Sequence, residues 1–472
     1  MILIEILLCF DGVVEFPARR RIGGDRLSKY NGKRLAAETL DLDFEGLRQG
    51  YYSDAYFSNT VTILETLARE GYKFEGQRDH GMDANKVLTG DIEVEMQFFP
   101  RRQPFAVVVG VDESLLMLKE CVGYYNDQGE FLNTYANLSV EATDDGVLTP
   151  YDGNSLNVKP VLKIRGRYRD FAELETPILG VLTEGSRIAT NVYNTLVAAR
   201  GKDLLFFPAR FAHYKVQALH GYAYQIAVQA YNHKYGTNSR VFVSTNAQGS
   251  SFGGKGGGTI SHASIACFLG DTVETMMQFS RIMPLTVPRI ALIDFHNDCV
   301  GESQRVMKAM FERYWELITA GEHSEAQKYK LYAVRPDTAG NMRDVSVEPI
   351  GEKELDCGVN PRLVWNIRHG LDTAFKDWSL EGEALLVATE YCRAVKIVVT
   401  GGFDIVRISK FESLGVPVDI YGVGSSLLEN GRGTTTDFTG DIVRLKIDGE
   451  WKHLSKLGRR PNDNPDLKPV ND

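Results

Sequence analysis

The chain has 472 residues, of which 43% are hydrophobic and 24% charged, a composition ordinary for a globular protein of more than one domain. The formal net charge is −9 and the basic residues are dispersed, so no nucleic-acid partner is expected, and no apolar run approaches the roughly 20 residues of a membrane span. The six cysteines are far apart and form no Cys-x-x-Cys pair, which argues against zinc and disulfides and favours a reducing, cytoplasmic location.

Residues 1–165 are predicted to form an α+β domain. The opening segment MILIEILLCF carries Glu5 and lacks a basic stretch and a small-residue cleavage site, so we interpret it as a strand rather than a signal peptide. Further along, apolar runs such as FAVVVGV at 105–111 alternate with turn sequences such as NDQGEF and DDGV.

Residues 166–435 have a different texture, in which short apolar runs alternate with segments of helical period. The segment 404–415, for example, spaces Ile405, Ile408 and Phe411 as one apolar stripe. Two other helices are expected at 303–321 and 360–378. Strands are expected at 203–210, 239–245, 288–298, 329–337, 395–402 and 417–424. This alternation predicts a parallel sheet that is buried on both faces.

Each expected strand of this region, apart from 239–245, ends in charged or glycine residues. In a parallel barrel these ends meet at one rim, where active sites form. An open doubly wound sheet would also bind ligands at its strand ends. Because about six to eight strand–helix units fit the length, we favour an α/β fold with an irregular TIM-like (β/α) barrel. Residues 436–472 are expected to pack back on the N-terminal domain.

Two strand–glycine–helix segments suggest a phosphate site. VTGGFDIVRI places Gly401 and Gly402 after one strand, and IYGVGSSLL places Gly422, Gly424 and Ser425 after the next. Glycine allows backbone N–H groups to approach an anion, and a helix N-terminus favours negative charge. Two tight turns are the alternative interpretation, but two consecutive instances at the end of a barrel favour phosphate binding.

Charged and aromatic residues at other strand ends are candidates for ligand binding. Arg335 and Asp337 share one face of a strand, where they suit a phosphate and either a ribose hydroxyl or Mg²⁺, although an ion pair explains them as well. Asp294, His296 and Asp298 in IDFHND could be imagined as metal ligands, but their spacing matches no zinc signature, so no protein-only metal site is expected. Phe207 and Arg210 offer a ring and a cation to a flat anion, although core packing also explains Phe207.

The run Gly253–Gly258 precedes His262. It approaches the P-loop pattern G-x-x-x-x-G-K, but Gly256 stands where Ser or Thr is needed to bind Mg²⁺. We therefore interpret the glycines as support for His262 rather than as a phosphate cradle. A lone histidine near a loop is more often structural or solvated than catalytic, so this residue does not identify the function without further context.

Taken in order over roughly residues 50–430, these motifs resemble those of nicotinate phosphoribosyltransferases. The resemblance implies that Phe207, in FPAR, and Tyr56, in SDAYFSNT, clamp a pyridine ring, with the tyrosine coming from the partner subunit of a homodimer. It also implies that His262, in GGTISHA, is transiently phosphorylated by ATP. Nicotinate would face the STNAQG turn, and the nucleotide phosphate would face the two glycine loops. The residues concerned are Ser244, Thr245 and Asn246 in the turn, and Gly401, Gly402, Gly422, Gly424 and Ser425 in the loops.

The resemblance further implies that Arg210 and Arg335 bind the phosphates of phosphoribosyl pyrophosphate (PRPP), and that Asp294 and Asp337 position ribose and Mg²⁺-pyrophosphate. The expected activity forms nicotinate mononucleotide and pyrophosphate from nicotinate and PRPP, coupled to ATP hydrolysis, in NAD salvage. The chain departs from the usual motifs at three places, with Phe211 in place of a second arginine, Thr338-Ala339 in place of Ser-Gly, and Thr400 in place of serine.

Three alternatives remain open at this stage. Nicotinamide-specific relatives use an aspartate that would repel a carboxylate, whereas Asn246 can donate a hydrogen bond, which favours nicotinate. A quinolinate phosphoribosyltransferase needs a more cationic pocket and no phosphorylated histidine. A barrel that binds a nucleotide or PRPP with weak or no catalysis is the third alternative.

Overall fold

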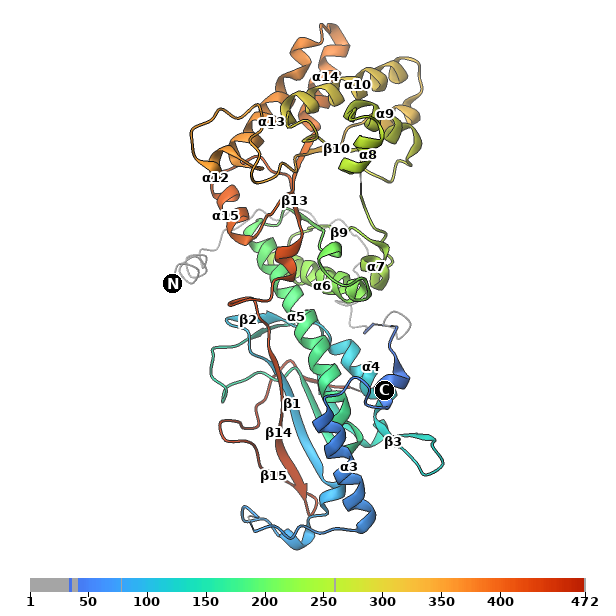
Figure 1. Ribbon diagram of the computed structural model, residues 1–472, viewed down its shortest axis with the longest axis vertical. Coiled ribbons are helices and arrows are strands. Elements are labelled where there is room, and N and C mark those ends of the chain that lie inside the picture. Colours follow the sequence, from blue (N-terminus) through green and yellow to red (C-terminus); the bar gives the residue numbers. More distant parts are fainter. Residues whose placement is uncertain (1–33, 36–40, 78, 259, 471–472) are drawn as a thin grey trace. The chain divides into compact units, whose positions relative to one another are not determined.

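The computed structural model describes residues 34–35, 41–77, 79–258 and 260–470 (Figure 1). All elements discussed below belong to one unit, Leu35–Asp472. The strand expected at the start of the chain lies outside the described residues.

An antiparallel six-stranded sheet contains most of the strands of the N-terminal region. Its order is β15-β14-β1-β7-β5-β16, with β1 at Glu93–Pro100, β5 at Ser139–Ala142, β7 at Leu162–Arg167, β14 at Phe438–Ile447, β15 at Glu450–His453 and β16 at Lys468–Pro469. The last three strands come from the C-terminal segment, and β14 pairs with β1 along the whole length of β1. Strand β7 runs two residues past the expected boundary at residue 165.

Helices and small hairpins complete this region. The helices are α2 (Phe44–Arg48), α3 (Ala55–Glu70) and α4 (Val111–Cys121), and the paired strands are β2 (Phe105–Val107) with β6 (Leu148–Pro150) and β3 (Gly123–Tyr125) with β4 (Phe131–Asn133). NDQGEF forms the turn of the β3–β4 hairpin, as predicted. FAVVVGV, in contrast, is strand only over its first three residues. Gly110, with φ +108°, turns the chain there, and α4 begins at Val111.

A parallel sheet confirms the six strands expected between residues 203 and 424. Its order is β10-β11-β12-β13-β8-β9, and every pair is parallel. The strands are shorter than the apolar runs that predicted them. They are β8 (Asp203–Phe206), β9 (Val241–Val243), β10 (Ile290–Leu292), β11 (Ala333–Arg335), β12 (Lys396–Val399) and β13 (Ile420–Val423).

The sheet follows chain order around a curve but is not closed. The pairing of β13 with β8 joins the last strand of the series to the first, as a barrel requires. Within the described residues no pairing joins β9 to β10. One apolar cluster takes side chains from all six strands: Leu205, Phe242, Ile290, Ala333, Val398 and Ile420. The α/β class and the parallel sheet are therefore confirmed, whereas a closed barrel is not observed.

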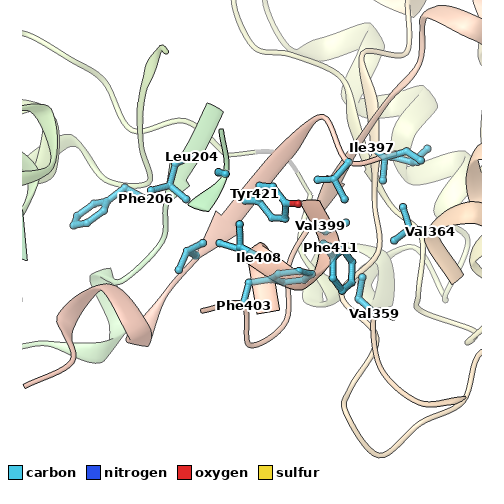
Figure 2. Close-up of a cluster of buried hydrophobic side chains, with 14 of the residues drawn as sticks. Leu204, Phe206, Val359, Val364, Ile397, Val399, Phe403, Ile408, Phe411 and Tyr421 are labelled. Carbon is cyan, nitrogen blue, oxygen red and sulfur yellow. The ribbon is translucent and has the colours of Figure 1, made fainter. Parts of the chain in front are cut away.

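Helices cover the face of the parallel sheet opposite the apolar cluster of the six strands. They are α5 (Glu175–Ala198), α6 (Gln217–Tyr235), α9 (Thr272–Ile282), α10 (Cys299–Thr319), α13 (Pro361–Thr373), α14 (Gly382–Ala394) and α15 (Ile405–Ser413). Figure 2 shows this core where Val399 and Tyr421 of the strands pack with Ile408 and Phe411 of α15. The helix expected at 404–415 is thus present with its apolar stripe facing the sheet. None of the helices in the described ranges is long and apolar enough to span a membrane.

Helix α5 joins the two cores. Ile178 and Leu182, near its start, pack in the core of the antiparallel sheet, while Ile188 and Leu196 pack in the core of the parallel sheet. A 24-residue helix spans both because two stretches of it are apolar on the faces that meet the sheets.

Candidate functional site

His262 and Asp294 meet at one end of the parallel sheet. His262 is the first residue of α8 (His262–Cys267), which begins with reciprocal side-chain bonds between Ser261 and Ser264. Asp294 follows β10. The Nε2 atom of His262 lies 3.0 and 3.1 Å from the two carboxylate oxygens of Asp294. The histidine side chain is 49% exposed and the aspartate side chain only 8%. The carboxylate thus orients an imidazole whose other face is open to solvent.

Burial raises the pKa of the Asp294 carboxyl above its ordinary value. His262 opposes this shift by charge and hydrogen bonding, and nearby Asp337 adds to it. No described residue makes a hydrogen bond to Nδ1 of His262. A ring held at one nitrogen with the other nitrogen available can act as a nucleophile toward a phosphoryl group or as a proton acceptor.

Arg335, Asp337 and Thr400 form a second group at adjoining strand ends. Arg335 Nη1 lies 3.7 Å from Asp337 Oδ2, and its Nη2 donates to the carbonyl of Ile260 at 3.2 Å. Thr400 Oγ1 donates to Asp337 Oδ1 at 2.8 Å. The Arg335 side chain is 16% exposed, and burial lowers its pKa, while Asp337 and Asp294 oppose the shift. Because the carboxylate of Asp337 lies 3.7 Å away, too far for a short hydrogen bond, the guanidinium of Arg335 keeps N–H donors for an anionic ligand.

Phe207 lies over Gly422 in the neighbouring strand. A Cβ atom on Gly422 would come within 2.5 Å of Thr400 Cγ2 and 3.1 Å of Phe207 Cε2. The glycine therefore makes room for one ring and one methyl group. Phe207 also packs against the apolar cluster of the six strands, so both interpretations of this residue, core packing and ligand stacking, apply to it.

The second glycine segment differs from the prediction. After β13 the chain forms a 3₁₀ turn, Ser425–Leu428, rather than an α-helix, and Gly424 leaves room for the ring of Phe211, whose Cε2 would lie 2.8 Å from a Cβ. Ser425 is exposed at the start of this turn. A local Gly-x-Gly pattern does not show that the ring of Phe211, which is distant in sequence, approaches this glycine. The first segment has the predicted order of strand, glycine turn and helix, because Gly401 and Gly402, with φ +95° and +69°, lead from β12 into α15.

The STNAQG turn uses two of its three polar side chains internally. Thr245 caps α7 (Asn246–Gly249) in a reciprocal arrangement with Gln248 and also donates to Gln217 at 2.8 Å. Ser244 Oγ donates to Gln248 Oε1 at 3.0 Å. Asn246 is exposed, and its Oδ1 accepts from the N–H of Gly256 at 2.9 Å, while no described residue accepts from its amide nitrogen.

The glycine run before His262 folds back on this turn. The N–H groups of Gly254 and Gly257 donate to the carbonyls of Gly249 and Val243, at 2.9 and 2.7 Å. Backbone donors consumed in this way cannot hold a phosphate, and among the described residues of 253–261 no helix begins. The geometry agrees with the interpretation that the resemblance to a P-loop is accidental.

Two predicted residues lie outside the contacts just described. Arg210 is exposed and lies over the ring of its neighbour Phe211, with its guanidinium carbon 5.1 Å from the ring centre. Tyr56, on α3, is 60% exposed and donates to Asp54 Oδ2 at 3.0 Å. No contact in the described structure joins Tyr56 to the strand-end residues.

Thr400 was not among the predicted site residues, although it links Asp337 to the strand that carries the glycine loop. Its position directly before Gly401-Gly402, at a strand end, is the sequence feature that could have identified it. Within the described ranges no three His, Cys, Asp or Glu side chains are gathered closely enough to hold a metal ion. Asp294 and Asp337 could supply at most part of a Mg²⁺ coordination shell, with the rest coming from substrate oxygens.

The fold is shared with enzymes of known structure. No family model matches the chain. The nicotinate-nucleotide pyrophosphorylase of Pyrococcus furiosus is similar over 91% of this chain and 85% of its own length, with 23% identity and a TM-score of 0.59. Human nicotinic acid phosphoribosyltransferase is similar over 85% of this chain and 76% of its own length, with 14% identity and a TM-score of 0.52. At these identities the likeness establishes the common fold.

Proposed function

We propose that the protein is a cytoplasmic nicotinate phosphoribosyltransferase that forms nicotinate mononucleotide and pyrophosphate from nicotinate and PRPP in NAD salvage. The observation that carries this proposal is the gathering of His262, Asp294, Arg335 and Asp337 at the ends of the adjacent strands β10 and β11, with Phe207 directly after β8 of the same sheet. The shared fold with two enzymes named for nicotinate nucleotide chemistry supports it.

In the proposed reaction the ring nitrogen of the base forms a bond to the anomeric carbon of ribose as the bond to the pyrophosphate oxygen breaks. The electron pair leaves with pyrophosphate, and the transition state has oxocarbenium character. Arg335 and Arg210 would hold the anionic groups, and Asp294 and Asp337 would hold ribose hydroxyls, so that the two reactants are aligned. Mg²⁺ bound with the pyrophosphate would neutralise the leaving group.

The flat base would lie against Phe207, with Tyr56 of the partner subunit on its other face in a homodimer with shared active sites. The amide nitrogen of Asn246 would donate to the nicotinate carboxylate. Among the described residues, Arg335 is the guanidinium that lies beside Asp337, and one cation at this place fits a monocarboxylate base with PRPP better than the dicarboxylate quinolinate. A barrel that binds PRPP without catalysis is the other alternative.

The direct test is to incubate the full chain with PRPP, Mg²⁺ and labelled nicotinate, nicotinamide or quinolinate, with and without ATP. We expect PRPP-dependent formation of nicotinate mononucleotide at a rate at least about tenfold above that for the other bases, because one unpaired or repelled polar group costs this much or more. A preference for nicotinamide or quinolinate would overturn the specificity. Binding of PRPP without turnover of any base would replace the enzyme by a sensor.

Replacement of His262 by alanine is expected to abolish ATP hydrolysis that depends on nicotinate and PRPP, while some PRPP-dependent turnover remains. The base attacks ribose without help from the imidazole, whereas phosphoryl transfer from ATP needs its nitrogen. Phosphate release and mononucleotide formation are measured on the same samples. His323→Ala is the matched control. Like His262, His323 is exposed and is the first residue of a short helix, α11 (His323–Ala326). Full ATP stimulation of the His262 variant would exclude this role.

A further inference from the structure

The side chain of Arg407, a residue of α15, holds the backbone carbonyls of the loop Gly401-Gly402. The Nη1 atom of Arg407 donates to the carbonyl of Gly401 at 2.5 Å and to that of Gly402 at 3.2 Å. Its Nη2 donates to the carbonyl of Val359 at 2.6 Å, in the segment that precedes α13. The guanidinium carbon lies 4.2 Å from the centre of the Phe403 ring. One side chain therefore fixes two consecutive peptide groups of the loop.

Holding the carbonyls also sets the direction of the amides. In a trans peptide the C=O and N–H bonds point in opposite directions. Because the carbonyls of Gly401 and Gly402 point toward Arg407, the N–H groups of Gly402 and Phe403 point away from it. Within the described residues neither N–H group donates to any acceptor. Two adjacent unpaired N–H groups form the kind of concavity that binds anions.

The charge of Arg407 also favours an anion at the loop. Burial lowers its pKa and the nearby Asp404 opposes the shift. The Asp404 carboxylate caps α15 by accepting from the backbone N–H of Arg407, and the guanidinium itself contacts only carbonyls and rings. The cation under the loop is thus not neutralised by a direct carboxylate contact, and a nine-residue helix that begins at Ile405 adds its dipole.

We propose that Arg407 is a positioning residue that aims the N–H groups of Gly402 and Phe403 at a phosphate group of the ligand. That this group is the 5′-phosphate of PRPP and of the mononucleotide product rests on the proposed function. Arg407 itself does not touch the ligand. Its role is to present the backbone donors and to supply positive charge beneath them.

The test compares Arg407→Met and Arg407→Lys in the full chain. The affinities for inorganic phosphate and for nicotinate mononucleotide are measured by calorimetry, and KM is measured for each substrate. We expect the Met variant to bind phosphate about tenfold or more weakly and to raise KM for PRPP, with KM for nicotinate within about twofold of the parent. The Lys variant should be intermediate, because a lysine cannot hold three carbonyls in a fixed fork.

Arg289→Lys is the control. Arg289 is buried and, like Arg407, donates only to carbonyls, among them those of Ser280 and Met283 at 3.1 and 2.7 Å. It precedes β10 and therefore lies at the opposite end of the sheet. The Arg289→Lys substitution should leave phosphate affinity unchanged. Unchanged affinity in a folded Arg407→Met variant, checked by circular dichroism, would overturn the proposal, as would a parent protein that binds no phosphate. If the Met variant cannot be folded, the Lys variant decides. Weakened phosphate binding without any transferase turnover would support the loop's role and remove the proposed reaction.

Discussion

Replacement of Arg335 by alanine is expected to lower kcat/KM for PRPP by about a thousandfold, the scale of losing one well-placed electrostatic group in an active site. The Arg335 side chain is 16% exposed and lies 3.7 Å from Asp337, while Asp294 is also close enough to affect its pKa. Removing the guanidinium takes away the cation beside Asp337 at the place where the substrate brings further negative charge.

The pH dependence of the Arg335→Ala variant should shift as well. Burial and Asp337 already raise the pKa of Asp294. Without the positive charge of Arg335 the ionised form of this carboxyl is less stable, so its pKa rises further. Because the ionised form is the one proposed to hold ribose, the residual activity should be lost at a higher pH on the acid side than in the parent.

Two variants calibrate this result. Arg335→Lys keeps the charge but not the fork and should recover only part of the activity. Arg240→Ala removes another arginine paired with an aspartate, Asp203 at 2.7 Å, at the amino end of β8, and should leave kcat/KM within about twofold. A KM for PRPP in Arg335→Ala within about threefold of the parent would show that the guanidinium does not bind the substrate phosphates.

The parallel sheet could be predicted because its determinants are local. Apolar runs bounded by polar residues identified β8 to β13, and the same runs indicated that Asp294, Arg335 and Gly401 lie at strand ends. The absence of pairing between β9 and β10 could not be predicted, because hydrophobic pattern sets which face of a strand is buried and not which edge it meets.

The individual roles of site residues were harder to predict, because several depend on contacts between distant segments. Position 422 requires glycine because the side chains of Thr400 and Phe207 approach it closely, and these residues precede it by 22 and 215 positions in the chain. The internal use of Thr245 is different, since Thr245 and Gln248 form a capping pattern of the kind T-x-x-Q that local sequence does show. This pattern is visible in the sequence and indicates local use of the Thr245 side chain.

The contact between Gly422 and Thr400 leads to the second large effect. Gly422→Ala is expected to destabilise the protein by about 1–3 kcal/mol, as overpacking of a core does, and to lose most activity. The new methyl group would lie 2.5 Å from Thr400 Cγ2. Thr400 can move that methyl by rotating about its Cα–Cβ bond, but rotation takes its hydroxyl away from Asp337 Oδ1, 2.8 Å away. The steric cost is therefore transmitted to a residue proposed to hold the substrate.

Thr400→Ser provides the decisive comparison. Serine lacks the Cγ2 atom and keeps the hydroxyl, so the double variant Gly422→Ala/Thr400→Ser should recover most of the stability and activity that Gly422→Ala loses. Thermal unfolding and kcat/KM of the four proteins form a double-mutant cycle, and a coupling of about 1 kcal/mol or more is expected for groups in direct contact. Gly180→Ala, at an exposed helical glycine with nothing within 4 Å of a Cβ, should be neutral or slightly stabilising. Equal losses in the single and double variants would mean that Phe207, 3.1 Å from the same Cβ, imposes the requirement for glycine instead of Thr400.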